Sequence, residues 1–510
     1  MATKDEPRQQ PLHILFFPFL ATGHLIPVAN MAALFAARGA RCTILTTPVN
    51  ASIIRPAVDR ANDANFHGPD SQEIVISVVP FPRVGLPPGF ENVQSPTPAN
   101  AESCHVKFLR GAHLLREPFE QFLAAKGPHS VDAVVSDSFF PWSADAAAAH
   151  GVTRLVFLGT SVFARSCSES MLRNNPLENM TTYRPDGEDP DDDARLVSLP
   201  GLPDRVELRR SQMLDPTKRP EEWAMYQSTN AADQRSFGEV FNSFRGLEPD
   251  YLEYFHATLG RRAWLVGPVA LTSSSSSRDT TEDVANNSCL RWLDTKPAGS
   301  VVYVSLGTNS SFSAAEEREI ARGLDLSGNN FLWVIRGTID ESSEWMPPGF
   351  AELLARGGRG FVARGWAPQT LILDHLALGG FVTHCGWNSV LEAVSAGVPM
   401  VMWPRYCDQF HNEKLLLEVL KVGVSIGAKD YATPMEAHEV ISGEVVGASI
   451  RRLMSDSEEG DAIRKKAKEL SVMARSAAEK GGSSYNDVGR LLDELIARRS
   501  PIEDFAAATG

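Results

Sequence analysis

The same order of segments occurs twice along the 510-residue chain, and this repeat limits the possible folds more than any other feature. Near the start, an apolar segment at 12–17 is followed by a loop at 18–23, a helical pattern over about 24–38, and a second apolar segment at 41–47. A strand, a helix and a strand within about 35 residues form a crossover unit, whose two strands are parallel. We therefore predict a parallel sheet with helices on its faces.

The second copy of the pattern begins in the middle of the chain. Further strands of the first half are predicted at 74–79, 133–136 and 155–158, with a helix at 143–150; the second half has strands at 300–306, 331–335, 360–363, 380–383 and 399–403 and a helix at 314–326. A serine run at 273–277, flanked by polar residues through Ser288, has the composition of a flexible linker. We predict an α/β protein of two doubly wound domains, at 1–272 and 289–484, joined by a linker at 273–288 and followed by a C-terminal helix and tail at 485–510.

Composition excludes several classes of function. The chain has 49 Lys and Arg against 63 Asp and Glu, a net charge of −14, whereas nucleic acid binding needs a basic face. Its six cysteines are scattered, without Cys-x-x-Cys pairs or zinc-ligand spacing, so we expect a reducing, cytoplasmic location. The apolar run at 14–21 is too short to cross a bilayer, and we predict no membrane span. The Gly-x-Gly-x-x-Gly and Walker A patterns are absent, which argues against NAD chemistry and P-loop ATP hydrolysis.

Polar residues follow a predicted strand of the second half. Residues 381–389 leave the strand, turn, and enter a helix that ends near Gly397. A helix start presents unpaired N–H groups and a partial positive charge, so it can hold a phosphate, and His384 and Ser389 add donors. The alternative is structural, because residues 389–392 match a capping box, which needs no ligand.

In the first half, His24 lies at a helix start and Asp137 ends another strand of the same predicted sheet. A carboxylate on one ring nitrogen would fix the tautomer and stabilise the imidazolium, which makes His24 a candidate general base for a substrate hydroxyl. We expect the helix terminus to keep the ring neutral. The structural alternatives are a packed ring for His24 and a helix cap for Asp137.

Residues 366–409 carry a resemblance to a known family. They read WAPQTLILDHLALGGFVTHCGWNSVLEAVSAGVPMVMWPRYCDQ, which resembles without a gap the signature box of plant secondary-metabolite glycosyltransferases that use uridine diphosphate (UDP) sugars. The resemblance extends to the G-H-x-x-P motif at 23–27, to 136–137 and to 305–308. It implies the GT-B fold, two facing Rossmann-like domains with the active site in the cleft between them, and a last helix, near 485–499, that packs on the first domain.

The resemblance also implies roles for individual residues. Trp366 would stack on uracil, Gln369 would lie near uracil and ribose, and Glu392 would accept hydrogen bonds from the ribose hydroxyls. The diphosphate would be held by Thr308, His384, Asn388 and Ser389, and the sugar would face Trp387, Asp408 and Gln409. His24 would be the general base and Asp137 its partner. Phe19, Phe139, Phe140 and Trp142 would line the acceptor pocket.

These expectations together predict a hexosyltransferase that is inverting and independent of metal. It would move glucose, which Gln409 accompanies in the family, from a UDP-sugar co-substrate to a hydroxyl of a lipophilic flavonoid or other phenolic, steroid or triterpenoid. A metal-dependent glycosyltransferase is an alternative, because residues 189–193 contain an Asp-x-Asp pattern, although they have the character of a solvated acidic loop. A non-catalytic sugar-nucleotide-binding protein would keep the second-half box and lack the pair of His24 and Asp137.

Overall fold

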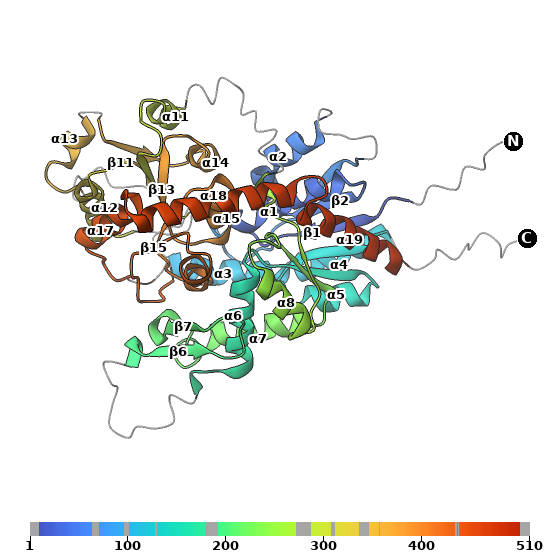
Figure 1. Ribbon diagram of the computed structural model, residues 1–510. Helices are drawn as coiled ribbons and strands as arrows, with labels where there is room; N and C mark the ends of the chain where they lie inside the picture. Colours follow the sequence, from blue (N-terminus) through green and yellow to red (C-terminus); the bar gives the residue numbers. More distant parts are fainter. Residues whose placement is uncertain are drawn as a thin grey trace, which may run out of the picture.

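The computed structural model describes residues 10–63, 71–95, 101–127, 130–178, 192–271, 287–307, 312–335, 346–355, 358–433, 436 and 438–499. Within these ranges it contains two large sheets with helices against their faces (Figure 1). The first sheet has seven strands in the order β3-β2-β1-β4-β5-β8-β9, and the second has six in the order β12-β11-β10-β13-β14-β15. Every neighbouring pair in both sheets is parallel, as the crossover pattern predicted.

The first half supplies the seven-stranded sheet and a short hairpin. Its strands are β1 (His13–Phe17), β2 (Arg41–Thr46), β3 (Ile74–Val78), β4 (Ala133–Asp137), β5 (Thr153–Phe157), β8 (Gly238–Phe241) and β9 (Ala263–Leu265), and the antiparallel hairpin consists of β6 (Leu196–Leu199) and β7 (Val206–Arg209). Its α-helices are α1 (Thr22–Ala36), α2 (Pro48–Asn62), α3 (Ala101–Leu114), α4 (Arg116–Lys126), α5 (Ser143–Ala149), α6 (Val162–Asn174), α7 (Pro220–Gln234) and α8 (Pro249–Ala257). Short 3₁₀ turns lie at Asp192–Ala194 and Arg210–Gln212.

The second half repeats the arrangement. Its strands are β10 (Val301–Ser305), β11 (Asn330–Ile335), β12 (Gly360–Arg364), β13 (Leu378–Thr383), β14 (Met400–Met402) and β15 (Gly423–Ser425). Its helices are α11 (Ser288–Leu293), α12 (Ala314–Ser327), α13 (Phe350–Ala355), α14 (Gln369–Leu373), α15 (Trp387–Ala396), α16 (Gln409–Lys414) with a π-helical continuation at Leu415–Val419, α17 (Gly443–Met454), α18 (Glu458–Ala478) and α19 (Ser483–Arg498).

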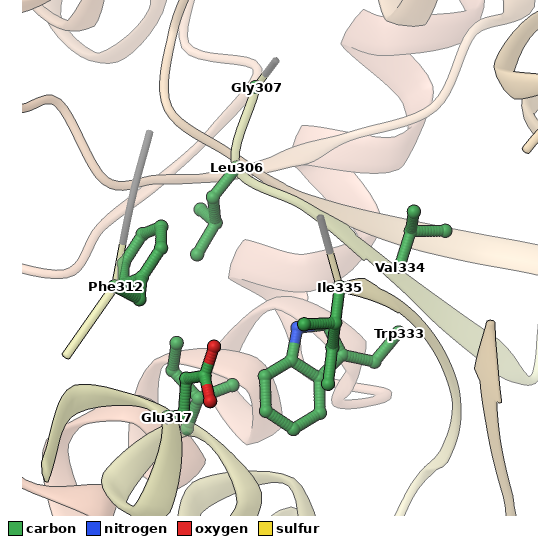
Figure 2. Close-up of a pocket in the computed structure, with 8 residues that line it drawn as sticks. Leu306, Gly307, Phe312, Glu317, Trp333, Val334 and Ile335 are labelled. Atoms are coloured by element: carbon green, nitrogen blue, oxygen red, sulfur yellow. The ribbon is translucent and has the colours of Figure 1, made fainter. Parts of the chain in front are cut away.

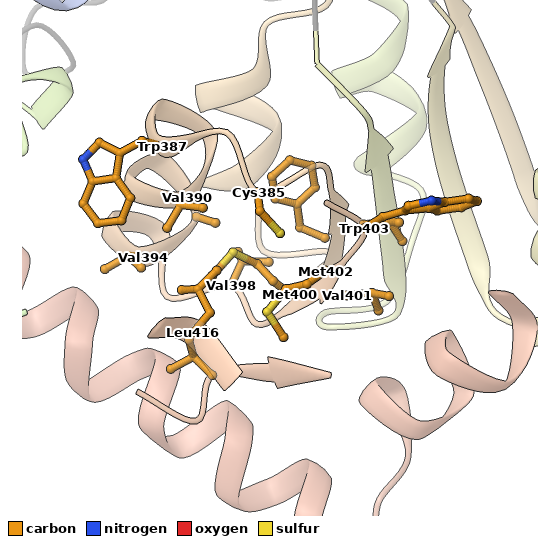
Figure 3. Packing of buried hydrophobic residues seen from close by; sticks show 14 of the residues in the cluster. Cys385, Trp387, Val390, Val394, Val398, Met400, Val401, Met402, Trp403 and Leu416 are labelled. Atoms are coloured by element: carbon orange, nitrogen blue, oxygen red, sulfur yellow. The ribbon is translucent and has the colours of Figure 1, made fainter. Parts of the chain in front are cut away.

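The central strands are apolar because helices cover both faces of each sheet. Every residue of β1 and of β10 is buried. Figure 3 shows part of the second core, in which Met400 and Met402 of β14 lie with Val390 and Val394 of α15. This burial holds the carboxyl ends of the strands, where ligands of such sheets bind, in fixed positions.

The predicted strands and helices are present, each within two residues of the expected bounds. Helix α1 begins at Thr22, two residues before the expected start, so Pro27 lies in its second turn. The predicted linker at 273–288 lies outside the described residues except for its last two.

The last two helices run from the second half back to the first, where they are drawn in red in Figure 1. Leu491 and Leu495 of α19 are buried in the core of the first sheet. The Asp487 carboxylate accepts a hydrogen bond of 3.0 Å from the backbone N–H of Leu265 in β9. Among the described residues, no helix is both long enough and apolar enough to cross a bilayer.

Candidate functional site

His24 and Asp137 come together at the carboxyl edge of the first sheet, because β1 pairs with β4. The Nδ1 atom of His24 lies 2.7 Å from Oδ2 of Asp137, and Oδ1 of Asp137 accepts from the backbone N–H of Phe139 at 3.1 Å. The Asp137 side chain is fully buried, while 19% of the His24 side chain is exposed. Nδ1–H therefore donates to the carboxylate, and Nε2 is the nitrogen that is left to take a proton.

Charge around His24 changes its titration. Burial lowers the pKa of this imidazole, but the adjacent Asp137 and the charge of Asp408 outweigh burial, so the pKa is raised above its ordinary value. The direction of this shift is opposite to the one that a helix start favours, because both carboxylates stabilise the protonated ring. The same carboxylates stabilise the imidazolium that forms when the ring takes a proton.

Helix α15 starts without a side-chain cap. Gly386 is its N-cap residue and Ser389 its third residue, and no hydrogen bond from a side chain among the described residues caps it. The predicted capping box at 389–392 is therefore wrong, because the helix begins two residues before Ser389. The N–H groups of the first turn have no acceptor within the helix, which makes them available to an anion.

The His384 imidazole lies against two glycines just before this helix. A Cβ atom at Gly307 would be 2.7 Å from Nε2 of His384, and one at Gly386 would be closer still. Gly307 also has a φ of 91°, which disfavours other residues. Sequence reasoning missed Gly307, although it lies within the 305–308 segment that resembles the family. Thr308, predicted to bind the diphosphate, lies outside the described residues.

Gln369, Ser389 and Glu392 form one hydrogen-bonded group. Nε2 of Gln369 donates to Oε2 of Glu392 at 2.7 Å and to Oγ of Ser389 at 3.1 Å, and the Tyr303 hydroxyl donates to Oε1 of Gln369 at 3.2 Å. Burial raises the pKa of Glu392 to about 7, although the hydrogen bond from Gln369 opposes this shift. Further hydrogen bonds from hydroxyl groups would stabilise the charged form of this buried carboxylate, and a ribose supplies two such groups. Trp366, two residues after β12, has 72% of its surface exposed and is open to stacking.

The two halves meet at this site. Nδ2 of Asn388, in the first turn of α15, donates to the Gly23 carbonyl at 2.7 Å. The Thr160 hydroxyl, after β5, donates to Oδ2 of Asp408 at 2.5 Å. Gly23 immediately precedes His24, so the histidine and the start of α15 lie on opposite sides of a single interface.

The three residues predicted to face the sugar differ in position. Asp408 is half-buried at the interface. Oε1 of Gln409 is occupied by the backbone N–H groups of Arg405 at 2.9 Å and Tyr406 at 3.2 Å. The Trp387 indole is buried and donates through Nε1 to the Asn242 carbonyl at 2.7 Å, so it points into the interface between the halves and not toward an open face.

The predicted acceptor residues divide into two pairs. The rings of Phe19 and Phe139 each lie 5.7 Å from that of His24. Phe140 and Trp142 lie deeper in the buried cluster that also contains Phe17 and Phe19, and neither ring contacts His24. Only the first pair is placed to contact a molecule held at His24.

A small cavity lies at the carboxyl ends of β10 and β11 (Figure 2). Leu306, Gly307, Phe312, Glu317 and Trp333 are among the residues that line it. Burial, and then the charge of Glu316, raise the pKa of the Glu317 carboxyl. A carboxylate repels a diphosphate, so this cavity adjoins the candidate anion site without being part of it.

No group of three metal-ligating side chains occurs among the described residues. Residues 189–191 of the Asp-x-Asp pattern lie outside them, and the carboxylate of Asp193 pairs with Lys218 at 2.8 Å on the surface. This ion pair is typical of a solvated loop.

Comparison with known proteins agrees with this geometry. Residues 275–436 match the family described as UDP-glucoronosyl and UDP-glucosyl transferase. The chain is 40% identical to an anthocyanin 3'-O-beta-glucosyltransferase of Gentiana triflora over 496 residues, which cover 95% of this chain and 98% of that one. The solved structure of UGT73P12 of Glycyrrhiza uralensis, complexed with glycyrrhetinic acid 3-O-monoglucuronide, has a TM-score of 0.84, 36% identity and 96% coverage of both chains. That of UGT71G1 of Medicago truncatula, complexed with UDP-glucose, has a TM-score of 0.73, 26% identity and coverage of 95% of this chain and 98% of that one. With its two parallel sheets and near-complete match to such relatives, the chain belongs to the plant UDP-glycosyltransferase family and is a UDP-glycosyltransferase of the GT-B fold.

Proposed function

We propose that this enzyme transfers glucose, with inversion and without a metal, from UDP-glucose to a hydroxyl of a lipophilic small molecule. The observation that carries the proposal is the interface at Gly23 and Asn388, which faces the paired His24 and Asp137 toward the start of α15. One side of this interface offers a base, and the other offers donors to an anion.

On the acceptor side, Nε2 of His24 takes the proton of the acceptor hydroxyl as its oxygen attacks the anomeric carbon. Asp137 holds Nδ1–H and stabilises the imidazolium. The oxygen enters on the face opposite the diphosphate, so the α-linked donor gives a β-glycoside. Phe19 and Phe139 form apolar surface beside the base, which suits an aromatic or polycyclic acceptor.

On the donor side, the first turn of α15 stabilises the charge that develops on the leaving diphosphate. Its N–H groups, with Ser389 and His384, take the place that a metal ion has in other transferases; each preorganised donor of this kind is worth about 3–4 kcal/mol. Trp366 stacks on uracil. The Glu392 carboxylate, which Gln369 holds in place, accepts hydrogen bonds from the ribose hydroxyls.

The donor and acceptor classes rest on relatives and on local chemistry. The Gentiana relative is named for glucosylation of an anthocyanin, and the Glycyrrhiza structure holds a triterpenoid glucuronide. We therefore propose flavonoids or other phenolics, steroids and triterpenoids as acceptors of this chain. Asp408 and Gln409, at the start of α16, are proposed to bind the glucose.

The central test is a product assay. Purified protein with UDP-glucose and a panel of flavonoid, steroid and triterpenoid acceptors should yield glycoside and free UDP in equal amounts, with β configuration by NMR. A protein that bound UDP-glucose and released neither product would be a binding protein instead.

The role of the base and the absence of a metal have separate tests. His24→Ala should bind UDP with unchanged affinity and lose transfer, and turnover close to that of the wild type would exclude His24 as the base. Transfer should keep its full rate in excess chelator, whereas a rate restored only by added Mg²⁺ or Mn²⁺ would favour the metal-dependent alternative.

A further inference from the structure

Pro27 leaves a backbone carbonyl of α1 without its usual partner. In an α-helix the N–H of each residue donates to the carbonyl four residues before it, and proline has no N–H. Pro27 is the sixth residue of α1, so the carbonyl that loses its donor is that of Gly23. The proline ring also crowds that carbonyl and tilts it away from the helix axis.

The opposite half of the molecule supplies the missing donor. Nδ2 of Asn388 lies 2.7 Å from the Gly23 oxygen. Oδ1 of the same amide is buried and has no hydrogen-bond partner among the described residues. The amide therefore faces Gly23 through its nitrogen, because the reversed orientation would bring two oxygen atoms together.

This hydrogen bond connects the two parts of the reaction centre. Gly23 is bonded covalently to His24, and Asn388 is the second residue of α15, whose first turn is the anion site. Other contacts between the halves near the site run from Thr160 to Asp408, from Ser161 to Asn412 and from Trp387 to Asn242, and none of these three involves α1. The bond from Asn388 thus joins the helix that carries the base directly to the start of α15.

We propose that Pro27 is a positioning residue, which acts by freeing the Gly23 carbonyl to accept Asn388 and so fixes His24 relative to the start of α15. The proposal rests on the proposed function, since it assigns Pro27 a role in that reaction. It explains why a residue unfavourable within a helix stands in the second turn of α1, three residues from the base.

Restoring the N–H at position 27 tests the proposal. In both Pro27→Ala and Pro27→Gly, the Gly23 carbonyl regains a helical donor and is no longer tilted away from the helix axis, so we expect its bond from Asn388 to weaken. We expect kcat to fall by about 10- to 100-fold in both variants, as for a displacement of about 1 Å at a reacting centre. Their thermal midpoints should differ, because Ala favours a helix and Gly does not. Equal losses of kcat at unequal midpoints would separate positioning from stability.

Pro56→Ala is the control. Pro56 also lies inside a helix, α2, on its exposed side and outside the site, so this variant should keep the wild-type kcat.

A double-mutant cycle identifies the partner. Asn388→Ala should lower kcat, and adding Pro27→Ala to it should lower kcat no further, because the carbonyl already lacks its partner. The proposal would be overturned if the fold-loss in kcat of the double variant equalled the product of the two single losses. A Pro27→Ala variant with the wild-type kcat would also overturn it. The wild-type enzyme is assayed alongside, so absence of transfer in all samples would instead count against the proposed function.

Discussion

Replacing Asp137 by Asn removes the charge that supports His24 while keeping the size of the side chain. The wild-type carboxylate is fully buried and lies 2.7 Å from Nδ1, and its other oxygen is held by the N–H of Phe139. In the variant, the oxygen of the amide stays with Phe139 and its NH₂ group turns toward His24. The ring then carries its proton on Nε2, where it cannot accept one from the substrate.

The size of the effect follows from the geometry. Two unit charges with centres about 4 Å apart interact by about 4 kcal/mol at the effective dielectric constant of a protein site. At about 1.4 kcal/mol for each factor of ten, kcat should fall roughly 1000-fold. Because Asp137 raises the pKa of His24, its loss lowers that pKa, and the acidic limb of the kcat/KM profile should move to lower pH.

The assay is the rate of UDP release with a phenolic acceptor between pH 5 and 9, accompanied by UDP binding measured by calorimetry. Binding should be unchanged, because Asp137 is on the acceptor side. Asp145→Asn, on α5, is the control: the exposed carboxylate of Asp145 pairs with Arg235 just after α7, and this variant should keep both the rate and the pH profile. A kcat for Asp137→Asn within tenfold of the wild type, or an unmoved acidic limb, would refute the assigned role.

Three further perturbations have defined outcomes. Glu392→Gln should weaken UDP binding by about 10- to 100-fold, since hydrogen bonds to a charged group are worth about 1.5–3 kcal/mol. In calorimetry, the wild-type affinity for UDP should also fall as the pH drops below about 7, where the Glu392 carboxyl takes a proton. The variant should lack this pH dependence. Gly307→Ala should displace the His384 ring and raise the KM for UDP-glucose, and an unchanged KM would argue against a diphosphate contact by this ring. Leu491→Ala should destabilise the protein by about 2–5 kcal/mol, measured by thermal or urea unfolding, because α19 is part of the first core; Leu376→Ala, at a position 85% exposed, is the control and should have little effect.

The sequence alone was sufficient for the architecture, because strands buried on both faces are continuous apolar runs and the segments between them have helical periodicity. It was also sufficient for the end of α15, where Gly397 adopts the left-handed conformation that a helix terminus favours. The structural alternative for the start of the same helix, a capping box at 389–392, was wrong, since those letters begin two residues inside the helix.

Side-chain direction was harder to predict, because it depends on contacts distant in sequence. Phe139 and Phe140 are adjacent and equally apolar, yet one lies beside His24 and the other in the core. Tyr303 has no distinguishing signal, because it belongs to a strand in which every residue is buried. The pKa of His24 depends on Asp408, a residue of the other half that no local pattern connects to it.

The buried indole of Trp387 makes the contact between the halves observable by fluorescence. Its ring belongs to the second half and the carbonyl that it binds, that of Asn242, belongs to the first. Any movement that separates the two halves would break the hydrogen bond from the indole to the Asn242 carbonyl and expose the ring to water. Exposure to water shifts tryptophan emission to longer wavelength. The difference spectrum between the wild type and Trp387→Phe therefore isolates an intrinsic optical signal of opening and closing during turnover.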